Sequence, residues 1–286
     1  MSTFKKIKLK GYYATVWCRR FAMSIYGYIR SLKPVSAIFG PLFERSRDCI
    51  EIDITYACSL ACYNCNRSVR QAPSSEGLNT DQIRKFVSES ISGNKKWRRI
   101  RLLGGEPMIH PKIFEVLDIL LEYKREFSAD TEIAVHTNGY GKAVEKRLPL
   151  VPDDVVIVNT SKESDVNWFY PFNMAPRDSA FYKFADYSVG CRVPLDCGIG
   201  LTPYGYYPCA AAGSIDRVLG LNIARDKLPD DDDDMRDQMK KLCEYCGSFK
   251  MGGVTMFGEV DYEVASPSWD VAYEKWRKEK PKMSVY

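Results

Sequence analysis

The alternation of strand-like and helix-like segments between residues 49 and 158 is the feature that most limits how this chain can fold. Amphipathic helical patterns follow Thr80 and Pro111. Four runs read as strands: residues 49–55, 99–103, 131–136 and 155–158. Because parallel strands need a crossover connection, strands separated by helices predict a parallel sheet covered by helices. We therefore expect an α/β fold, either a barrel or a doubly wound sheet.

Composition excludes several classes of protein. Of 286 residues, 45% are hydrophobic and 27% are charged, which is typical of a globular chain with a substantial core and excludes collagen, coiled coil and wholesale disorder. No run approaches the roughly 18 uncharged apolar residues that a membrane-spanning helix needs. Arg19 and Arg20 interrupt the apolar stretch near the start before it reaches the length of a secretory signal, so we expect a cytoplasmic protein.

Basic charge is concentrated in the first 48 residues. They contain ten Lys or Arg and two acids, whereas the remainder of the chain has a net charge of −4. Residues 11–32 show helical spacing of apolar positions together with arginines, which predicts a basic amphipathic helix. Such a helix either caps the main domain or makes a peripheral contact with an anionic membrane surface. The acidic run at residues 230–234 is interpreted as a solvated loop or a helix N-terminus.

The ten cysteines indicate metal or redox chemistry, because the cytosol keeps thiols reduced. Cys58, Cys62 and Cys65 form a C-x3-C-x2-C triplet directly after a predicted strand. Three thiolates on one loop can bind three irons of a cubane cluster and leave the fourth iron open to a ligand. Zinc sites more often present thiols in C-x2-C pairs, so the triplet favours an iron-sulfur cluster.

Together with Gly-Gly-Glu-Pro after the second strand and Thr-Asn-Gly after the third, this loop resembles the radical S-adenosylmethionine (SAM) enzymes. The resemblance implies a partial (β/α)6 TIM-like barrel, a SAM-binding 4Fe-4S cluster on the three cysteines, and SAM itself as cofactor. Many members have an aromatic residue just before the third cysteine, whereas this chain has Asn64 there and Tyr63 one position earlier. The implied SAM contacts are Gly104, Gly105, Glu106, Pro107, Asn138, Asn159 and Ser161.

The C-terminal cysteines are similar to the SPASM and twitch auxiliary modules of this family. Five cysteines support one auxiliary 4Fe-4S cluster, the twitch arrangement, after a hairpin that turns at residues 203–205. The expected ligands are Cys197, Cys209, Cys243 and Cys246, with Cys191 as the alternative to Cys197; a zinc ion on the same thiols is the competing interpretation. The domains expected are a basic helical extension (1–48), the radical SAM partial barrel (49–187), a twitch-like module (188–250) and a C-terminal helical tail (251–286).

The resemblance implies an oxidoreductase that takes a hydrogen atom from a small polar substrate. The favoured reaction oxidises a secondary alcohol of a sugar or aminocyclitol, with or without a carrier, using the auxiliary cluster as electron acceptor and a flavodoxin- or ferredoxin-type electron donor. His136 is the candidate general base, although a structural role is the competing interpretation for both His136 and His110. The alternatives are an epimerase, a peptide-modifying enzyme, or a zinc-stapled binding protein without catalysis. A nucleic-acid partner is not expected, because aromatic and basic residues do not interleave.

Overall fold

The computed structural model describes residues 18–19, 21–167, 170–189, 191–249 and 261–286. Residues 18–19 and 21–31 are helical, which agrees with part of the helix predicted at 11–32. The rest of that prediction lies outside the described residues. Within the described ranges, no helix has the length and apolar character needed to cross a membrane.

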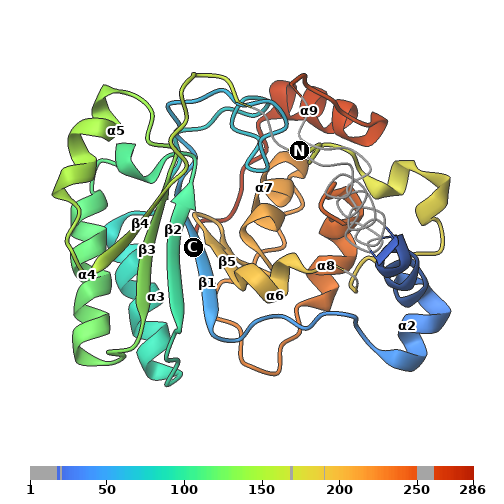
Figure 1. Ribbon diagram of the computed structural model, residues 1–286, viewed down its shortest axis with the longest axis horizontal. Helices are drawn as coiled ribbons and strands as arrows, with labels where there is room; N and C mark the ends of the chain where they lie inside the picture. Colours follow the sequence, from blue (N-terminus) through green and yellow to red (C-terminus); the bar gives the residue numbers. More distant parts are fainter. Residues whose placement is uncertain (1–17, 20, 168–169, 190, 250–260) are drawn as a thin grey trace, which may run out of the picture.

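A six-stranded, mostly parallel sheet forms the centre of the fold, with strand order β4-β3-β2-β1-β5-β6 (Figure 1). Every neighbouring pair is parallel except the β5–β6 hairpin, which is antiparallel as predicted. The strands are β1 (Cys49–Thr55), β2 (Arg99–Gly104), β3 (Glu132–Thr137), β4 (Val155–Asn159), β5 (Ile199–Thr202) and β6 (Gly205–Tyr207).

Helices α3, α4 and α5 lie on one side of β1–β4 (Figure 1). Asn79 and Gln82 start α3 with reciprocal hydrogen bonds between side chain and backbone. The strands turn one set of branched residues toward these helices, and this set with its helical partners makes the main core: Ile50, Ile52, Ile54, Ile100, Leu102, Ile133, Val135, Ile83, Phe86, Val116, Leu117 and Leu120. Besides the helical residues 18–19 and 21–31, the α-helices of the described residues are α2 (Lys33–Phe39), α3 (Thr80–Ser92), α4 (Ile113–Glu126), α5 (Lys142–Arg147), α6 (Val193–Cys197), α7 (Ala210–Leu219), α8 (Arg236–Leu242) and α9 (Pro267–Glu279).

The C-terminal part of the chain covers the opposite, inner face of β1 and β5. Helix α7 approaches so closely that a β-carbon at Gly200 would lie 2.2 Å from the backbone nitrogen of Ala210. Glycine at this position is therefore required for the packing. A second core of aromatic residues joins α7 to α9 and to the start of the loop after β1: Tyr56, Tyr207, Trp269, Tyr273 and Trp276.

The α/β class with a mostly parallel sheet is confirmed, and β1–β4 follow the predicted strand and helix order. The fifth and sixth strands depart from a six-repeat barrel. Strand β5 lies beside β1 instead of extending the sheet beyond β4, so β4 remains an edge strand with Val156, Ile157 and Val158 partly exposed. The described residues between β4 and β5 form short helices and turns and contribute no strand.

The acidic run at 230–234 forms a surface turn that is tied to neighbouring loops. Arg45 Nη2 donates to the Asp233 carbonyl oxygen at 2.7 Å, Lys95 pairs with Asp231, and Arg225 pairs with the Asp233 carboxylate. The run therefore acts as a structural loop, as the sequence indicated.

Candidate functional site

The loops after β1, β2, β3 and β4 meet at one edge of the sheet, because the carboxyl ends of parallel strands all face the same way. The Gly-Gly-Glu-Pro loop packs directly on the start of the cysteine loop. Gly105 N donates to Thr55 O at 2.7 Å, and Glu106 N donates to Ala57 O at 2.8 Å. A β-carbon at Gly105 would lie 2.1 Å from Ala57 O, so only glycine permits this contact.

Glu106 is fully buried and connects β2 with β3. Its Oε1 accepts from Met108 N at 3.0 Å and from Thr137 Oγ1 at 2.8 Å, and its Oε2 accepts from Asn138 N at 2.8 Å. Burial raises the pKa of Glu106, against the opposing effect of these hydrogen bonds. All three donors are neutral, and no Lys or Arg of the described chain forms an ion pair with this carboxylate. One of its roughly four lone-pair positions stays open to a further donor.

Asn138 links this carboxylate to the cysteine loop. Its backbone N–H is bound by Glu106, while its side-chain Nδ2 donates to Ser59 Oγ at 3.1 Å and to Cys58 Sγ at 3.7 Å. Leu60 N also donates to Cys58 Sγ, at 3.4 Å. Asn138 therefore contacts both features that the sequence analysis singled out.

The three thiols of the cysteine loop interact with one another. Cys62 is buried and Cys58 and Cys65 are half-buried. Burial raises the pKa of Cys58 to about 12, and the neighbouring Cys65 and Cys62 add to the effect. Across the described part of the chain, no three His, Cys, Asp or Glu side chains stand close enough for a single metal ion. A donor set of three thiols with amide donors aimed at sulfur fits an iron-sulfur cluster, whose sulfurs accept such bonds.

The C-terminal segment crosses the cysteine loop at Asn64, which is fully buried. Asn64 Nδ2 donates to Tyr262 O at 2.9 Å, and Asn64 Oδ1 accepts from Val264 N at 3.0 Å. The backbone of Asn64 has a positive φ of 53°, which asparagine tolerates better than an aromatic residue. The asparagine at this position thus has a structural explanation: it clamps residues 262–264 onto the loop.

A buried ion pair anchors the return of the cysteine loop to β1. Arg67 lies two residues beyond Cys65, and its Nε donates to both carboxylate oxygens of Asp53 at 3.2 Å. Its Nη2 adds a bond to Asp53 at 3.1 Å and an ion pair with Glu51 at 3.5 Å. Sequence reasoning missed these residues, although acids on a parallel strand, which is covered on both faces, signal buried partners.

His136 lies on the inner face of β3, near Arg101, which belongs to the same network of buried charges as Glu51 and Arg67. Arg101 pairs with Glu51 at 3.3 Å and donates to Asp196 O at 3.0 Å. Burial lowers the pKa of His136, and Arg101 lowers it further. His136 is therefore neutral near pH 7, which is the form that a general base requires. His110, by contrast, is buried with Nε2 bound to Leu78 O at 2.9 Å, a structural role.

The C-terminal thiols fall into one group of four and one outlier. Cys209 caps α7, Cys243 and Cys246 lie in the short helix η5 (Cys243–Tyr245) and directly after it, and Cys191 precedes α6. Burial raises the pKa of Cys243 well above its usual value, and the three others of the group contribute. We call Cys191, Cys209, Cys243 and Cys246 the second thiol set.

Cys197 lies apart from most of this set, against Glu51 and Arg101 on the inner face of the sheet. Burial raises the pKa of Cys197 to about 12, and Glu51 adds to the effect. The sequence analysis ranked Cys197 ahead of Cys191 as the fourth ligand. Cys191 acts on the pKa of both Cys209 and Cys243, whereas Cys197 acts on that of Cys209 and to a smaller extent than Cys191 does, which favours Cys191 as the fourth member.

The remaining predicted SAM contacts lie at the end of β4. Asn159 and Ser161 are exposed, and Asn159 Oδ1 accepts from Ser161 N at 2.8 Å. The Asn159 side chain also packs against Gly139, where a β-carbon would lie 2.2 Å from its Oδ1. The chain itself thus engages Asn159 in shaping the turn, and the exposed face of Ser161 borders the edge where the four loops meet.

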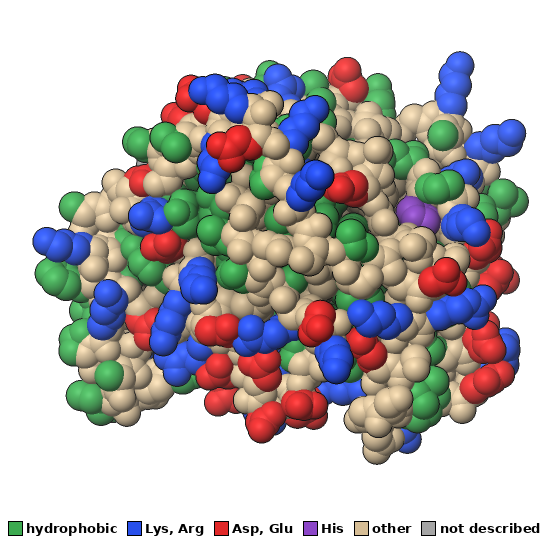
Figure 2. Space-filling view, turned by 180° about the vertical axis from the view of Figure 1, so that it is seen from behind, with side chains coloured by type: hydrophobic (Ala, Val, Ile, Leu, Met, Phe, Trp, Pro, Cys, Tyr) green, Lys and Arg blue, Asp and Glu red, His purple; other side chains and the backbone are tan. Residues whose placement is uncertain are grey.

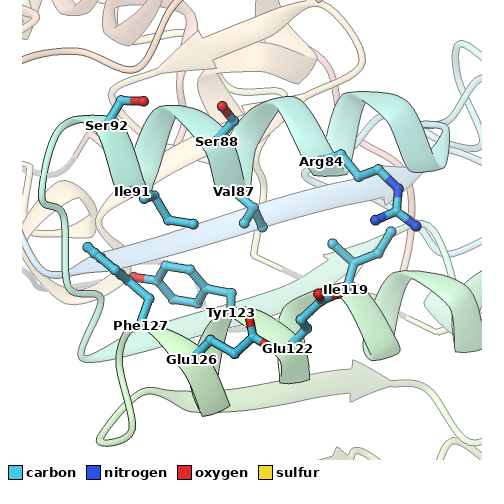
Figure 3. A pocket seen from close by; sticks show the side chains of 10 residues that line it. All are labelled: Arg84, Val87, Ser88, Ile91, Ser92, Ile119, Glu122, Tyr123, Glu126 and Phe127. Atoms are coloured by element: carbon cyan, nitrogen blue, oxygen red, sulfur yellow. The ribbon is translucent and has the colours of Figure 1, made fainter.

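A groove between α3 and α4 lies toward the amino ends of the strands, away from the loops described above. It has a volume of about 320 Å³, with Val87 and Ile91 facing Tyr123 and Phe127 (Figure 3). Tyr123 donates to Lys95 O just before β2, which places the groove near the amino ends of the strands. It is therefore separate from the cysteine loop.

A parallel α/β sheet with a cysteine triplet after β1 and Gly-Gly-Glu-Pro after β2 agrees with the resemblance to radical SAM enzymes that the sequence indicated. The model of the Radical SAM superfamily matches residues 52–159, which run from β1 to the end of β4.

Among curated proteins, the chain is similar to Molybdenum cofactor biosynthesis protein 1 of Homo sapiens, with 35% identity over 116 residues, 38% of this chain and 17% of that protein. It is also similar to GTP 3',8-cyclase of Nautilia profundicola, with 29% identity over 100 residues, 34% of this chain and 30% of that protein. The matches thus span less than a third of either relative. The crystal structure of BtrN in complex with AdoMet and 2-DOIA has a TM-score of 0.43 and 14% identity, covering 72% of this chain and 94% of that chain, a likeness too distant to carry an argument.

Proposed function

We propose that this chain is a radical SAM oxidoreductase acting on a small polar substrate. The observation that carries the proposal is the buried carboxylate of Glu106, which has only neutral donors of the chain around it and lies one asparagine away from Cys58. A buried carboxylate without a cation is costly, and a ligand ammonium at its open lone pair would offset that cost. The amino group of SAM, held beside a cluster on the three thiols, has this chemistry.

The cysteine loop and its neighbours would hold the first cofactor pair. Cys58, Cys62 and Cys65 supply the cluster ligands, and Asn138 donates toward Cys58 Sγ. When bound, the cluster and SAM together supply a 5′-deoxyadenosyl radical that takes a hydrogen atom from a substrate carbon. Gly104 and Pro107 flank Glu106 in its loop, while Asn159 and Ser161 lie at the end of β4, on the far side of β3.

The groups on the inner face of the sheet favour a substrate with hydroxyl groups. It presents the neutral imidazole of His136 near Arg101 and Glu51, a set of groups that can bind hydroxyls and accept one proton. Oxidation of a secondary alcohol to a ketone removes one hydrogen atom from carbon, one proton from oxygen and one electron. His136 takes the proton in this proposal, and a second 4Fe-4S cluster on the second thiol set would supply the electron acceptor.

The first test is metal content after anaerobic reconstitution. Two cubane clusters predict about eight irons per chain, falling to about four in the Cys58/Cys62/Cys65→Ala variant. About one zinc per chain, with iron falling to none in that variant, would instead support the zinc-stapled interpretation of the C-terminal thiols.

The second thiol set is tested in the same background. Adding Cys191→Ser to the triple variant is expected to remove the remaining iron, whereas adding Cys197→Ser leaves it in place. Iron that survives Cys191→Ser and disappears with Cys197→Ser would contradict the assignment.

The reaction is tested by following SAM cleavage with dithionite or reduced flavodoxin and candidate substrates. Oxidation predicts one 5′-deoxyadenosine per ketone formed and no deuterium from solvent at the product carbon. Solvent deuterium at that carbon would support the epimerase instead. GTP and a peptide serve as comparison substrates, because the curated relatives include a GTP 3',8-cyclase and peptide modification is the other alternative.

A further inference from the structure

The helix that ends before α2 turns its apolar side toward solvent. Phe21, Ile25 and Ile29 repeat every four residues and are 53%, 46% and 45% exposed. The opposite side, which packs on the body of the protein, carries Gly27 and Ser31, both buried. A surface helix ordinarily buries its apolar stripe. This helix does the reverse, with Ile25 and Ile29 turned away from the body of the described chain.

The exposed apolar surface continues onto α2. Phe39 is 66% exposed, and Arg30 joins it to the helix. Arg30 Nη2 donates to Phe39 O at 3.2 Å, and the guanidinium lies 5.6 Å from the Phe39 ring centroid and 5.8 Å from the ring centroid of Tyr26. The two helices therefore present one continuous surface.

A third segment, just before residue 185, completes this surface. Tyr28 stacks on Phe181 with ring centroids 4.7 Å apart, and Lys33 N donates to Phe184 O at 2.9 Å. Hydrophobic side chains mixed with Lys and Arg are visible at this end of the molecule, at the left of Figure 2. We define the apolar patch by its exposed members: Phe21, Ile25, Tyr26, Ile29, Ile38, Phe39, Phe181 and Phe184.

The first two segments of the apolar patch carry basic charge only, and the nearby Asp186, which accepts from Ser36 Oγ at 3.0 Å, is paired with Arg236. Residues 18–43 contain four Lys or Arg and no Asp or Glu, while the chain beyond residue 48 is net acidic. Lys183 adds a cation between the two exposed phenylalanines, 5.7 Å from the Phe184 ring centroid. Large apolar patches are uncommon on monomeric proteins and mark interaction sites. An apolar surface with a cationic rim complements an anionic lipid headgroup layer above an acyl region.

We propose that the apolar patch docks this protein on the surface of an anionic membrane, with the helix lying in the plane of the interface. The exposed rings and isoleucines enter the boundary between headgroups and acyl chains, and the exposed Arg19, Lys33 and Lys183 face lipid phosphates. This mode needs no spanning helix, and it is independent of the proposed function.

The test uses the full chain and extruded vesicles of phosphatidylcholine, with or without about 30% phosphatidylglycerol, in a sedimentation assay. We expect binding to the anionic vesicles that weakens as salt is raised from 50 to 300 mM, because exposed charges are screened. Equal binding to pure phosphatidylcholine would overturn the assignment of an anionic partner, and no binding to either vesicle would overturn the proposal.

The apolar contribution is tested by Ile25→Glu/Ile29→Glu, which we expect to lower the partition coefficient at least tenfold. The matched control is Val271→Glu on α9, where the side chain is 67% exposed outside the patch. Circular dichroism confirms that each variant folds. An equal loss in the control would overturn the proposal.

The charge contribution is tested by Lys33→Glu/Lys183→Glu, which we expect to lower binding to anionic vesicles about tenfold or more. Its control is Lys112→Glu, an exposed lysine on the outer side of the sheet. Sedimentation velocity tests the competing possibility that a second copy of this chain covers the apolar patch. A dimer that Ile25→Glu/Ile29→Glu dissociates, without vesicle binding by the wild type, would replace the membrane by self-association.

Discussion

Removal of the Arg67 guanidinium should be among the most damaging single changes in the cysteine loop. Arg67 and Asp53 are both buried, at 7% and 0% exposed, and three hydrogen bonds of 3.1–3.2 Å join them. Arg67→Met keeps much of the volume but leaves the Asp53 carboxylate without its cation. Breaking a buried ion pair by removing one partner costs about 3–5 kcal/mol. Since whole domains are stable by only about 5–15 kcal/mol, this is a large fraction of the total.

The cost should also depend on pH. Burial raises the pKa of Asp53 even with Arg67 beside it, and loss of the guanidinium raises that pKa further. A carboxyl with a raised pKa in the folded chain binds its proton more tightly there than in the unfolded chain, so its contribution to stability falls as pH rises. The free-energy difference between wild type and Arg67→Met should therefore be larger at pH 7.5 than at pH 5.

Urea unfolding at both pH values, followed by tryptophan fluorescence, measures this difference. The control is Arg98→Met, because Arg98 pairs with Asp48 on the surface, where such pairs contribute only about 0–1 kcal/mol. The double variant Arg67→Met/Asp53→Leu should recover most of the lost stability, since it removes the stranded charge. The reasoning is refuted if Arg67→Met costs no more than Arg98→Met, or if its cost does not change with pH.

Three further predictions concern the same edge of the sheet. Gly105→Ala should cost about 1–3 kcal/mol in urea unfolding, because the new methyl overlaps a backbone carbonyl, whereas Gly93→Ala, whose β-carbon has 3.3 Å of clearance, should cost less than half as much. Asn64→Ala removes the hydrogen-bond partners of Tyr262 O and Val264 N, so limited proteolysis should cut near residues 262–264 at least several-fold faster. Unchanged cleavage would contradict the role of Asn64 in holding this segment on the cysteine loop. If His136 is the base, turnover should fall as pH drops through a pKa below 6.5, and His136→Gln should abolish this acid limb as well as lowering the rate; a limb that survives the substitution belongs to another group.

The strands and helices from β1 to β4 were predictable because their apolar residues repeat at the spacing of a strand or of a helix. Each strand also packs on helices that are close to it in the sequence. Residues 49–55 show the limit of that reasoning. Their polar positions, Glu51 and Asp53, resemble a solvent-facing side, yet α7 and the rest of the C-terminal part bury them. The pattern gives the strand but not what covers it, because the covering segment lies some 150 residues further along the chain.

The choice between Cys191 and Cys197 shows a similar limit. Spacing along the chain places both near Cys209, and only the folded chain shows that Cys191 acts on Cys243 while Cys197 lies against Glu51 and Arg101. Glu106 was singled out as a candidate site residue by its motif. Its hydrogen bonds to Thr137 and Asn138 were not, since they depend on the loops of two neighbouring strands meeting in space.

Strand β5 pairs with β1, so the cysteine loop, which follows β1, and the second thiol set, whose members flank the β5–β6 hairpin in the sequence, belong to the same sheet. Excising residues 188–250 would therefore remove β5 and should leave Glu51 and Asp53 of β1 uncovered along a new sheet edge. The register between β1 and β5, rather than a hinge or a linker, sets the distance between the cysteine loop and the second thiol set. Any electron passing between them would cross a distance set by the pairing of β1 with β5.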